Sequence, residues 1–204
     1  MKKIGNSYKT IVYESILNGI IKGEYKANQI INEQELVEKL KVSKSPIREA
    51  LALLCNEGVL RNLPRYGYEV VQLTKENIIE VLNFRFILEG GFLKETYDKI
   101  TEEQLKHLYY LNDLCKEPDD NPWIHWERNS EFHLALLSYS NNEYARTQLQ
   151  KSMIVLKRAY IQFFRESWRE NLMKREYHDN ILNSIKIKDI DNALKYLKEE
   201  LIDF

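Results

Sequence analysis

Apolar residues recur at helical spacing along most of the chain, and near the N-terminus they define two short segments. The segments lie between Glu33 and Gly58, with a polar break at residues 41–43. One apolar stripe of the second segment consists of Ile47, Ala50, Leu51 and Leu54. Because these positions are spaced i, i+3, i+4 and i+7, they fall on one face of a helix. The pattern therefore predicts two helices joined by a tight turn.

Turn-forming and strand-forming residues mark the start of the second helix and the segments after it. Ser43 is suited to cap this helix, and Pro46 suits its first turn, where a missing amide N–H costs little. Two segments of strand type follow at residues 59–63 and 68–73, and a turn at 64–67 joins them. Two helices, a tight turn and a β-hairpin together predict a winged helix-turn-helix.

The N-terminal end of the second helix carries residue types that bind DNA. In a winged helix-turn-helix this end enters the major groove. Hydroxyls bind phosphate there, and Lys and Arg reach the O6 and N7 atoms of guanine. The candidate DNA-binding residues are Ser43, Lys44, Ser45 and Arg48 on the helix, and Arg65, Tyr66 and Gly67 at the tip of the wing. The alternative is that Lys44 and Arg48 are only solvated surface charges, and the complete pattern favours DNA binding.

The same stretch resembles the GntR family of bacterial transcription regulators. The shared motifs are Glu33-Gln34-Glu35-Leu36, Val42-Ser43-Lys44-Ser45-Pro46-Ile47-Arg48-Glu49-Ala50-Leu51, Leu54, Glu57-Gly58 and Gly67. Two positions differ from the family pattern. Ala27-Asn28 replaces Pro-Gly, and Lys44 replaces an Arg, which keeps the charge but loses the bidentate fork. The resemblance adds Gln34 to the DNA-contacting residues and makes Arg48 the main candidate for base reading.

Beyond the wing the helical pattern continues, and no further strand is predicted. The segments that carry the pattern are 76–97, 101–115, 122–139, 143–168, 169–185 and 189–201. Their short connections predict an antiparallel bundle, and a helix at 6–22 is expected to support the helix pair. We therefore expect a mainly α protein, with a winged helix-turn-helix domain at 1–73 and an all-α helical domain at 74–204.

This second half resembles the ligand-binding FCD domain of the FadR-type GntR regulators. The resemblance rests on Arg85, Glu89, Phe132-His133, Asn141, His178, Ile181-Leu182, Asp189 and Ala193. In many such domains one Asp and three His residues hold a divalent metal. The corresponding residues here are Asn129, His133, His178 and Glu200.

The substitutions in this ligand set leave two interpretations open. Asn129 replaces the Asp and Glu200 replaces the last His, so the net charge of the set is unchanged. Two imidazoles and one carboxylate suit Zn, Ni, Mn or Fe, which indicates a retained site. In the alternative the metal has been lost, and His133 and His178 are hydrogen-bonded core residues.

Three other polar residues also have alternative roles. Arg85 lies among apolar neighbours and is either a fork for an effector carboxylate or half of a structural ion pair with Glu89 or another acid, which we favour. Arg158 is a second candidate for effector binding. His125 lies about two helical turns before His133 and is either a substitute metal ligand or, as we favour, a surface or half-buried residue.

Charge and composition narrow the class of protein. The net charge is −1, but residues 1–72 hold 11 Lys and Arg against 8 Asp and Glu, and the remainder holds 19 against 23. A mildly basic N-terminal part is typical of a DNA-binding module joined to another domain. Cys55 and Cys115 are interpreted as small buried residues without a disulfide. No apolar run is long enough to span a membrane, and no signal peptide is evident, so we expect a cytoplasmic protein.

These observations predict a regulator and not an enzyme. We expect a homodimer that binds double-stranded operator DNA, because two half-sites are needed for useful affinity. The resemblance implies that a small-molecule effector, an organic acid, binds the helical domain and modulates DNA affinity. One alternative is a constitutive DNA-binding dimer with a vestigial pocket. Another is a metal-dependent enzyme that uses His133, His178 and Glu200, which the lack of a phosphate loop, nucleophile motif or HExxH disfavours.

Overall fold

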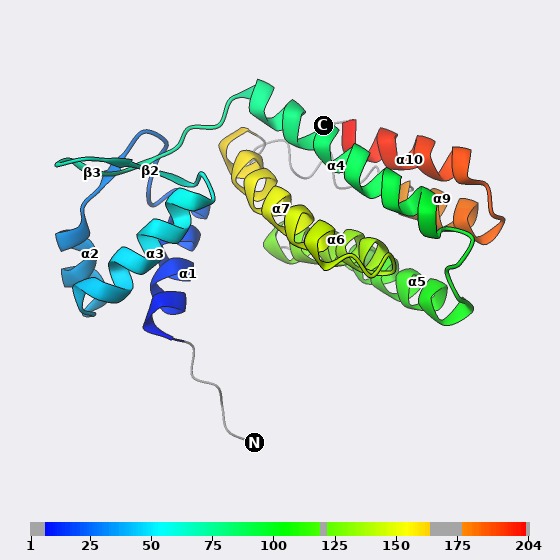
Figure 1. The fold of residues 1–204 in the computed structure, drawn as a ribbon, viewed down its shortest axis with the longest axis horizontal. Coiled ribbons are helices and arrows are strands. Elements are labelled where there is room, and N and C mark those ends of the chain that lie inside the picture. The colour runs from blue at the N-terminus through cyan, green and yellow to red at the C-terminus, as the bar shows by residue number, and fades with distance from the viewer. Residues whose placement is uncertain (1–6, 119–121, 164–176, 203–204) are drawn as a thin grey trace, which may run out of the picture. The chain divides into compact units, whose positions relative to one another are not determined.

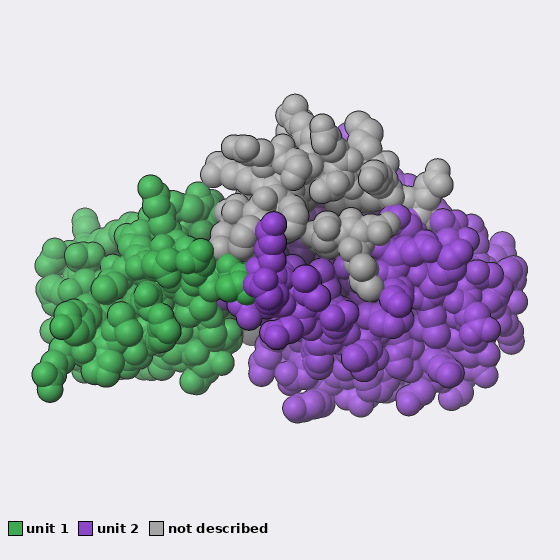
Figure 2. Space-filling model, turned by 90° about the horizontal axis from the view of Figure 1, so that it is seen from above, with its two compact units in different colours: residues 1–74 green, residues 75–204 purple. Residues whose placement is uncertain are grey.

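The computed structural model describes residues 7–118, 122–163 and 177–202 (Figure 1). The chain divides between Thr74 and Lys75 into two compact units, green and purple in Figure 2. They are named here the N-terminal unit and the helical unit. The predicted fold class is confirmed, because the protein is mainly helical with one small sheet.

The N-terminal unit combines three helices with a three-stranded antiparallel sheet (Figure 1). Its elements are α1 (Tyr8–Ile21), β1 (Ile30–Ile31), α2 (Glu33–Leu40), α3 (Lys44–Asn56), β2 (Leu60–Leu63) and β3 (Gly67–Val70). The strand order is β1-β3-β2, so β3 pairs with both neighbours. The two longer strands form the predicted wing. Strand β1 was not predicted, because two residues are too few to show an alternating pattern.

The core of this unit lies between α1 and α3. The predicted stripe of α3 is fully buried, and Val12 and Ile16 of α1 are each 1% exposed. Three of the turns use a left-handed backbone, at Asn28, Lys41 and Gly58. Asn28 has a φ of 63°, so the Asn that replaces the family glycine keeps the turn.

The helical unit is a bundle whose described residues contain no strand. Its described helices are α4 (Lys75–Thr96), α5 (Glu102–Lys116), α6 (Pro122–Ser138), α7 (Glu143–Phe163), α9 (Tyr177–Lys186) and α10 (Ile190–Ile202). Helix α4 packs against α7 and α10, while α5 packs against α6 and α9. The predicted segments 143–168 and 169–185 both extend into residues 164–176, which lie outside the described residues.

One apolar cluster packs α4, α5, α6, α9 and α10 against one another. Phe132, Leu108 and Leu197 are each 0% exposed and belong to this cluster. Cys115 is buried there as predicted, but the prediction for Cys55 was wrong, because that side chain is only half-buried. In the part of the chain that the structure describes, no helix is both long and apolar enough to cross a bilayer.

Candidate nucleic-acid interface and metal centre

The predicted DNA-binding residues of α3 share one exposed surface. Ser43, Lys44, Ser45 and Arg48 are all exposed at the N-terminal end of the helix. Ser43 occupies the N-cap position, but its hydroxyl makes no capping hydrogen bond. Gln34 is exposed near the start of α2, where its side-chain amide donates to Glu38 at 3.2 Å. Hydroxyl, amide and cationic groups are therefore presented to solvent from both helices.

Arg48 is held by a carboxylate from the other helix of the pair. Its Nε donates to both oxygens of Glu33, at 2.9 and 3.0 Å. The Arg48 side chain is 64% exposed and the Glu33 side chain 22%. The hydrogen bonds to Glu33, and then its charge, raise the pKa of the guanidinium, so Arg48 is a cation at any physiological pH.

The tip of the wing is exposed and conformationally constrained. Arg65 has a φ of 74° and Gly67 a φ of 129°, while Tyr66 is 73% exposed. A Cβ atom at Gly67 would lie 2.7 Å from the carbonyl oxygen of Ile31 in β1. Glycine is therefore required where β1 approaches the wing.

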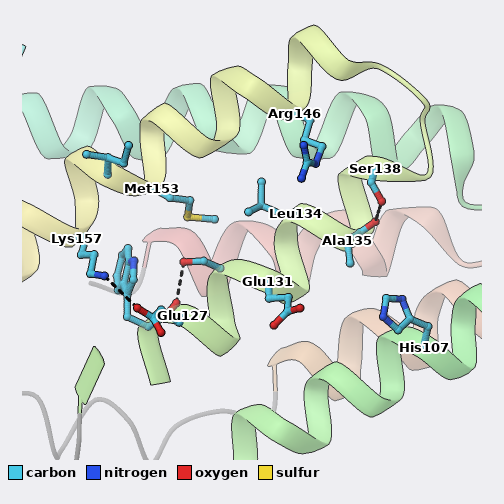
Figure 3. Close-up of a pocket in the computed structure, with 12 residues that line it drawn as sticks. His107, Glu127, Glu131, Leu134, Ala135, Ser138, Arg146, Met153 and Lys157 are labelled. Atoms are coloured by element: carbon cyan, nitrogen blue, oxygen red, sulfur yellow. Dashed lines mark hydrogen bonds and ion pairs between the residues drawn. The ribbon is translucent and has the colours of Figure 1, made fainter. Parts of the chain in front are cut away.

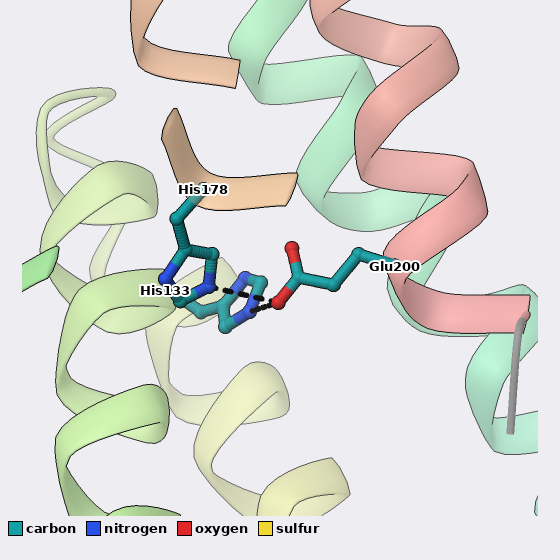
Figure 4. Close-up of side chains that lie close together, drawn as sticks. All are labelled: His133, His178 and Glu200. Atoms are coloured by element: carbon teal, nitrogen blue, oxygen red, sulfur yellow. Dashed lines mark hydrogen bonds and ion pairs between the residues drawn. The ribbon is translucent and has the colours of Figure 1, made fainter. Parts of the chain in front are cut away.

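The four residues that the resemblance assigned to a metal come together inside the helical unit. Figure 4 shows three of them, His133, His178 and Glu200. The Nε2 atoms of His133 and His178 lie 3.0 and 2.8 Å from the same oxygen of Glu200, Oε1. The Nδ2 atom of Asn129 lies 3.4 Å from that oxygen and 3.3 Å from His178 Nε2. These side chains come from α6, α9 and α10, so the packing of three helices builds the cluster.

A second layer of polar groups orients His133. Its Nδ1 atom lies 2.7 Å from Oε2 of Glu89, and the other oxygen of Glu89 accepts from Arg85 Nε at 2.7 Å. The favoured ion pair between Arg85 and Glu89 is thus confirmed, and both side chains are buried. A carboxylate behind the ring directs the opposite nitrogen of a metal-binding histidine toward the ion. Here that nitrogen faces Glu200.

The ionised groups of this cluster stabilise one another although they are buried. Burial lowers the pKa of His133, but Glu200 and Glu89 outweigh it and raise the value to about 9. Burial raises the pKa of Glu200, and the two histidines outweigh it and hold the value well below the usual range. These opposite shifts make His133 the cation and Glu200 the anion of a buried ion pair.

The donor set fits a divalent transition metal. Two imidazole nitrogens and one carboxylate oxygen lie within 4.8 Å of one another, and such donors suit Zn, Ni, Mn or Fe. Oε2 of Glu200 is buried and has no hydrogen-bond partner among the described residues. The amide of Asn129 can present its oxygen instead of its nitrogen, since the two ends are assigned from the hydrogen-bond network.

Two further candidates, His125 and Arg158, are both buried. The favoured reading of His125 was wrong, because the residue is 7% exposed and therefore buried, and it is not among the clustered ligand atoms of the described residues. Arg158 is buried on α7, and burial lowers its pKa to about 10.

An open groove of about 430 Å³ lies elsewhere in the helical unit, between α6 and α7 (Figure 3). Leu134 and Met153 contribute apolar surface, and Arg146 and Lys157 contribute cations. None of the predicted metal, effector or DNA-binding residues lines this groove. His107 lies at one end, and its Nδ1 atom is 2.9 Å from the Tyr139 hydroxyl.

Two contacts of the candidate sites escaped sequence reasoning. Glu33 and Arg48 are 15 positions apart, and Glu89 and His133 are 44 positions apart. No periodicity links such partners. The only local signal for Glu33 is its place in the family motif at the start of α2.

Comparison with known proteins gives consistent results for both units. Residues 9–70 match the family model described as bacterial regulatory proteins, gntR family, and residues 80–201 match the FCD domain. The uncharacterized HTH-type transcriptional regulator YdhC of Bacillus subtilis is 27% identical over 188 residues, which cover 91% of this chain and 84% of that protein. The gluconate operon transcriptional repressor of Bacillus licheniformis is 26% identical over 195 residues, covering 90% and 78%.

Solved structures support the fold. E. coli McbR/YncC superposes with a TM-score of 0.74 at 20% identity, covering 97% of this chain and 94% of that one. A putative transcriptional regulator GntR from Rhodococcus sp. RHA1 gives a TM-score of 0.73 at 22% identity, covering 97% and 95%. With a winged helix-turn-helix, a helical bundle and matches to both family models, the chain belongs to the GntR family of bacterial regulatory proteins and carries an FCD domain.

Proposed function

We propose that this protein is a homodimeric transcription regulator whose affinity for operator DNA is set by a small organic acid in the helical unit. The observation that carries the proposal is the exposed N-terminal end of α3, with Ser43, Lys44, Ser45 and Arg48. Its hydroxyls suit phosphate and its cations suit guanine. Such a protein acts where the chromosome lies, so we propose a cytoplasmic location.

Exposed apolar side chains on α4 support dimerisation. Ile79, Phe84 and Ile87 are 57%, 43% and 72% exposed. Gly91 follows one helical turn after Ile87, and open space surrounds the position where its side chain would begin. Large exposed apolar patches mark interaction surfaces. A second copy of the chain is the proposed occupant, because a two-fold symmetric operator requires two DNA-binding units.

The buried cluster supports a bound metal and an anionic effector. We assign His133, His178, Glu200 and Asn129 as ligands of one divalent ion, Zn, Ni, Mn or Fe. When bound, the ion supplies a Lewis-acidic contact for an acid effector.

The second contact for the effector is assigned to buried arginines. Nη2 of Arg85 is buried and has no hydrogen-bond partner among the described residues, so this atom is a candidate donor to a carboxylate. Arg158, buried on α7, is the second candidate.

One observation bears on a constitutive DNA-binding dimer as the second candidate function. Oε1 of Glu200 already accepts from both histidines, so this oxygen has its hydrogen-bond partners without a metal. Metal analysis of the purified protein separates the two candidates. The metal-dependent enzyme is not favoured, because the curated relatives are named as transcriptional regulators.

Selection from a library of random DNA duplexes tests the proposed function. The full-length protein should enrich inverted half-sites whose centres lie about one helical turn apart, and sedimentation should show two chains in each particle. Addition of metal and a panel of small carboxylic acids should change the affinity for the enriched duplex. A monomeric protein that binds random and selected duplexes with equal affinity would contradict the proposal.

A further inference from the structure

The ion pair between Arg48 and Glu33 places a negative charge on the surface that is proposed to face DNA. Both oxygens of Glu33 face the same nitrogen of Arg48, Nε, at 2.9 and 3.0 Å. Among the described residues, no hydrogen bond occupies the terminal nitrogens Nη1 and Nη2 of Arg48. The guanidinium is thus held at its inner end, and its outer end remains open.

The position of Glu33 is fixed by the elements around it. The preceding Asn32 caps α2, and its side-chain oxygen accepts from the backbone of Gln34 at 2.8 Å. Ile31 is 2% exposed and pairs in β1 with Tyr68 of β3. The strand pairing of Ile31 and the cap formed by Asn32 fix the backbone directly before Glu33. The Glu33 carboxylate is therefore well placed to hold Arg48.

The helix dipole favours an acid in the first turn of α2, but neither stability nor affinity explains why this acid contacts Arg48. An ion pair with one largely exposed partner contributes little to folding, because water screens it. A carboxylate near the DNA backbone weakens binding, because it repels phosphate. Orientation does explain it. A long exposed side chain such as that of Arg48 samples many rotamers. Hydrogen bonds from its Nε to Glu33 restrict these rotamers and leave the two terminal nitrogens to donate together to guanine O6 and N7.

We propose that Glu33 is a positioning residue for base reading, which aims the terminal nitrogens of Arg48 at the base edge. Glu33 thereby increases the discrimination between operator and unrelated DNA, while its charge lowers affinity for DNA of any sequence. The inference rests on the proposed role of Arg48 as the base reader.

Fluorescence anisotropy with two duplexes tests this inference. One duplex is the sequence enriched by the full-length wild-type protein, and the other is its scrambled counterpart at the same salt concentration. Glu33→Ala should reduce the ratio of the two affinities by about tenfold, with equal or higher affinity for the scrambled duplex. Glu33→Gln keeps one acceptor for Nε, so its ratio of affinities should lie between those of Glu33→Ala and the wild type. This second variant tests the inference even if Glu33→Ala does not fold.

The matched control is Glu35→Gln. Glu35 is exposed in the same first turn of α2, and no ion pair joins it to Arg48 among the described residues. Its replacement removes the same charge and the same interaction with the helix dipole. The ratio should stay at the wild-type value. An equal loss in Glu35→Gln and Glu33→Ala would reduce the effect to charge and overturn the inference.

A double-mutant cycle separates this inference from the function on which it rests. In an Arg48→Ala background, the further change Glu33→Ala should leave the ratio unaltered, because Glu33 acts through Arg48. If Arg48→Ala lowers the ratio and Glu33→Ala alone does not, only the positioning role is overturned. If Arg48→Ala leaves the ratio unchanged, the base reader is wrongly assigned and both proposals are overturned.

Discussion

Two arginine–carboxylate pairs, one in each unit, place the same chemical groups in opposite surroundings. Arg48 and Glu33 pair at the surface, with side chains 64% and 22% exposed. Arg85 and Glu89 pair in the interior, with side chains 3% and 2% exposed. In both pairs the arginine Nε faces the carboxylate, at 2.9 and 2.7 Å. The pairs thus differ in their access to water and in what each carboxylate contacts next.

Access to water determines what each pair can do. The surface pair is screened and adds little to stability, but its terminal nitrogens can reach another molecule. The buried pair is costly to break, because a buried charge without a partner loses its compensation. Glu89 also holds His133 with its second oxygen. The surface pair therefore suits recognition, and the buried pair suits a preorganised site.

The largest expected effect comes from breaking the buried pair. Glu89→Ala leaves Arg85 and His133 in the interior without their carboxylate, and should lower the free energy of unfolding by about 3–5 kcal/mol. Denaturant titration of the full chain measures it. Glu95→Ala, at an exposed position of the same helix, should stay within about 0.5 kcal/mol of wild type. Comparable losses in the two variants would show that the buried pair has no special role.

Metal binding should stabilise the helical unit, where the buried pair lies, and leave the surface pair unaffected. At a Zn concentration of about 100 times Kd, the free energy of unfolding should rise by about 2.7 kcal/mol. His133→Ala with His178→Ala should abolish the rise, which thermal unfolding with and without chelator measures. A rise that persists in the double variant would place the ion elsewhere.

Glu89→Gln sharpens this prediction, because it separates packing from ligand orientation. Arg85 donates to position 89, so the amide oxygen of Gln should face Arg85 and its NH₂ group should face His133. That group donates to Nδ1, which places the ring proton on Nε2, where the metal must bind. Zn affinity should fall by about 10–100-fold, as titration calorimetry would show. Unchanged affinity would mean that Glu89 does not set the tautomer.

The two regions also differ in how far the sequence predicted them. The helix pair and wing were predicted from local spacing, because Ile47, Leu51 and Leu54 repeat within a single helix. The buried cluster came only from family resemblance, because His133, His178 and Glu200 lie on three helices that are distant along the chain. Periodicity could not assign His125 to the interior, since an imidazole fits a buried or an exposed position. The contacts Glu33–Arg48 and Glu89–His133 depend on tertiary packing.

At the surface pair the expected loss is in recognition and not in stability. Arg48→Ala should reduce the preference for the selected duplex by about tenfold or more, because the bidentate donor to guanine is removed. Thermal unfolding and circular dichroism should stay as in wild type, because the side chain is largely exposed. If the variant keeps its sequence preference, Arg48 does not read the bases of the operator.

The smallest expected effect is at Lys44, where this chain departs from the family Arg. Lys44→Arg keeps the charge, so the salt dependence of DNA binding should not change. It restores a planar fork that can donate to two guanine atoms at once. Selection with this variant should therefore shift base preference at one position of each half-site, by about threefold. Lys22→Arg, at an exposed position after α1, makes the same chemical change away from the end of α3 and should leave the selected sequence as it is. If both variants select the wild-type sequence, Lys44 contacts only phosphate, and base reading by α3 rests on Arg48 and the carboxylate that holds it.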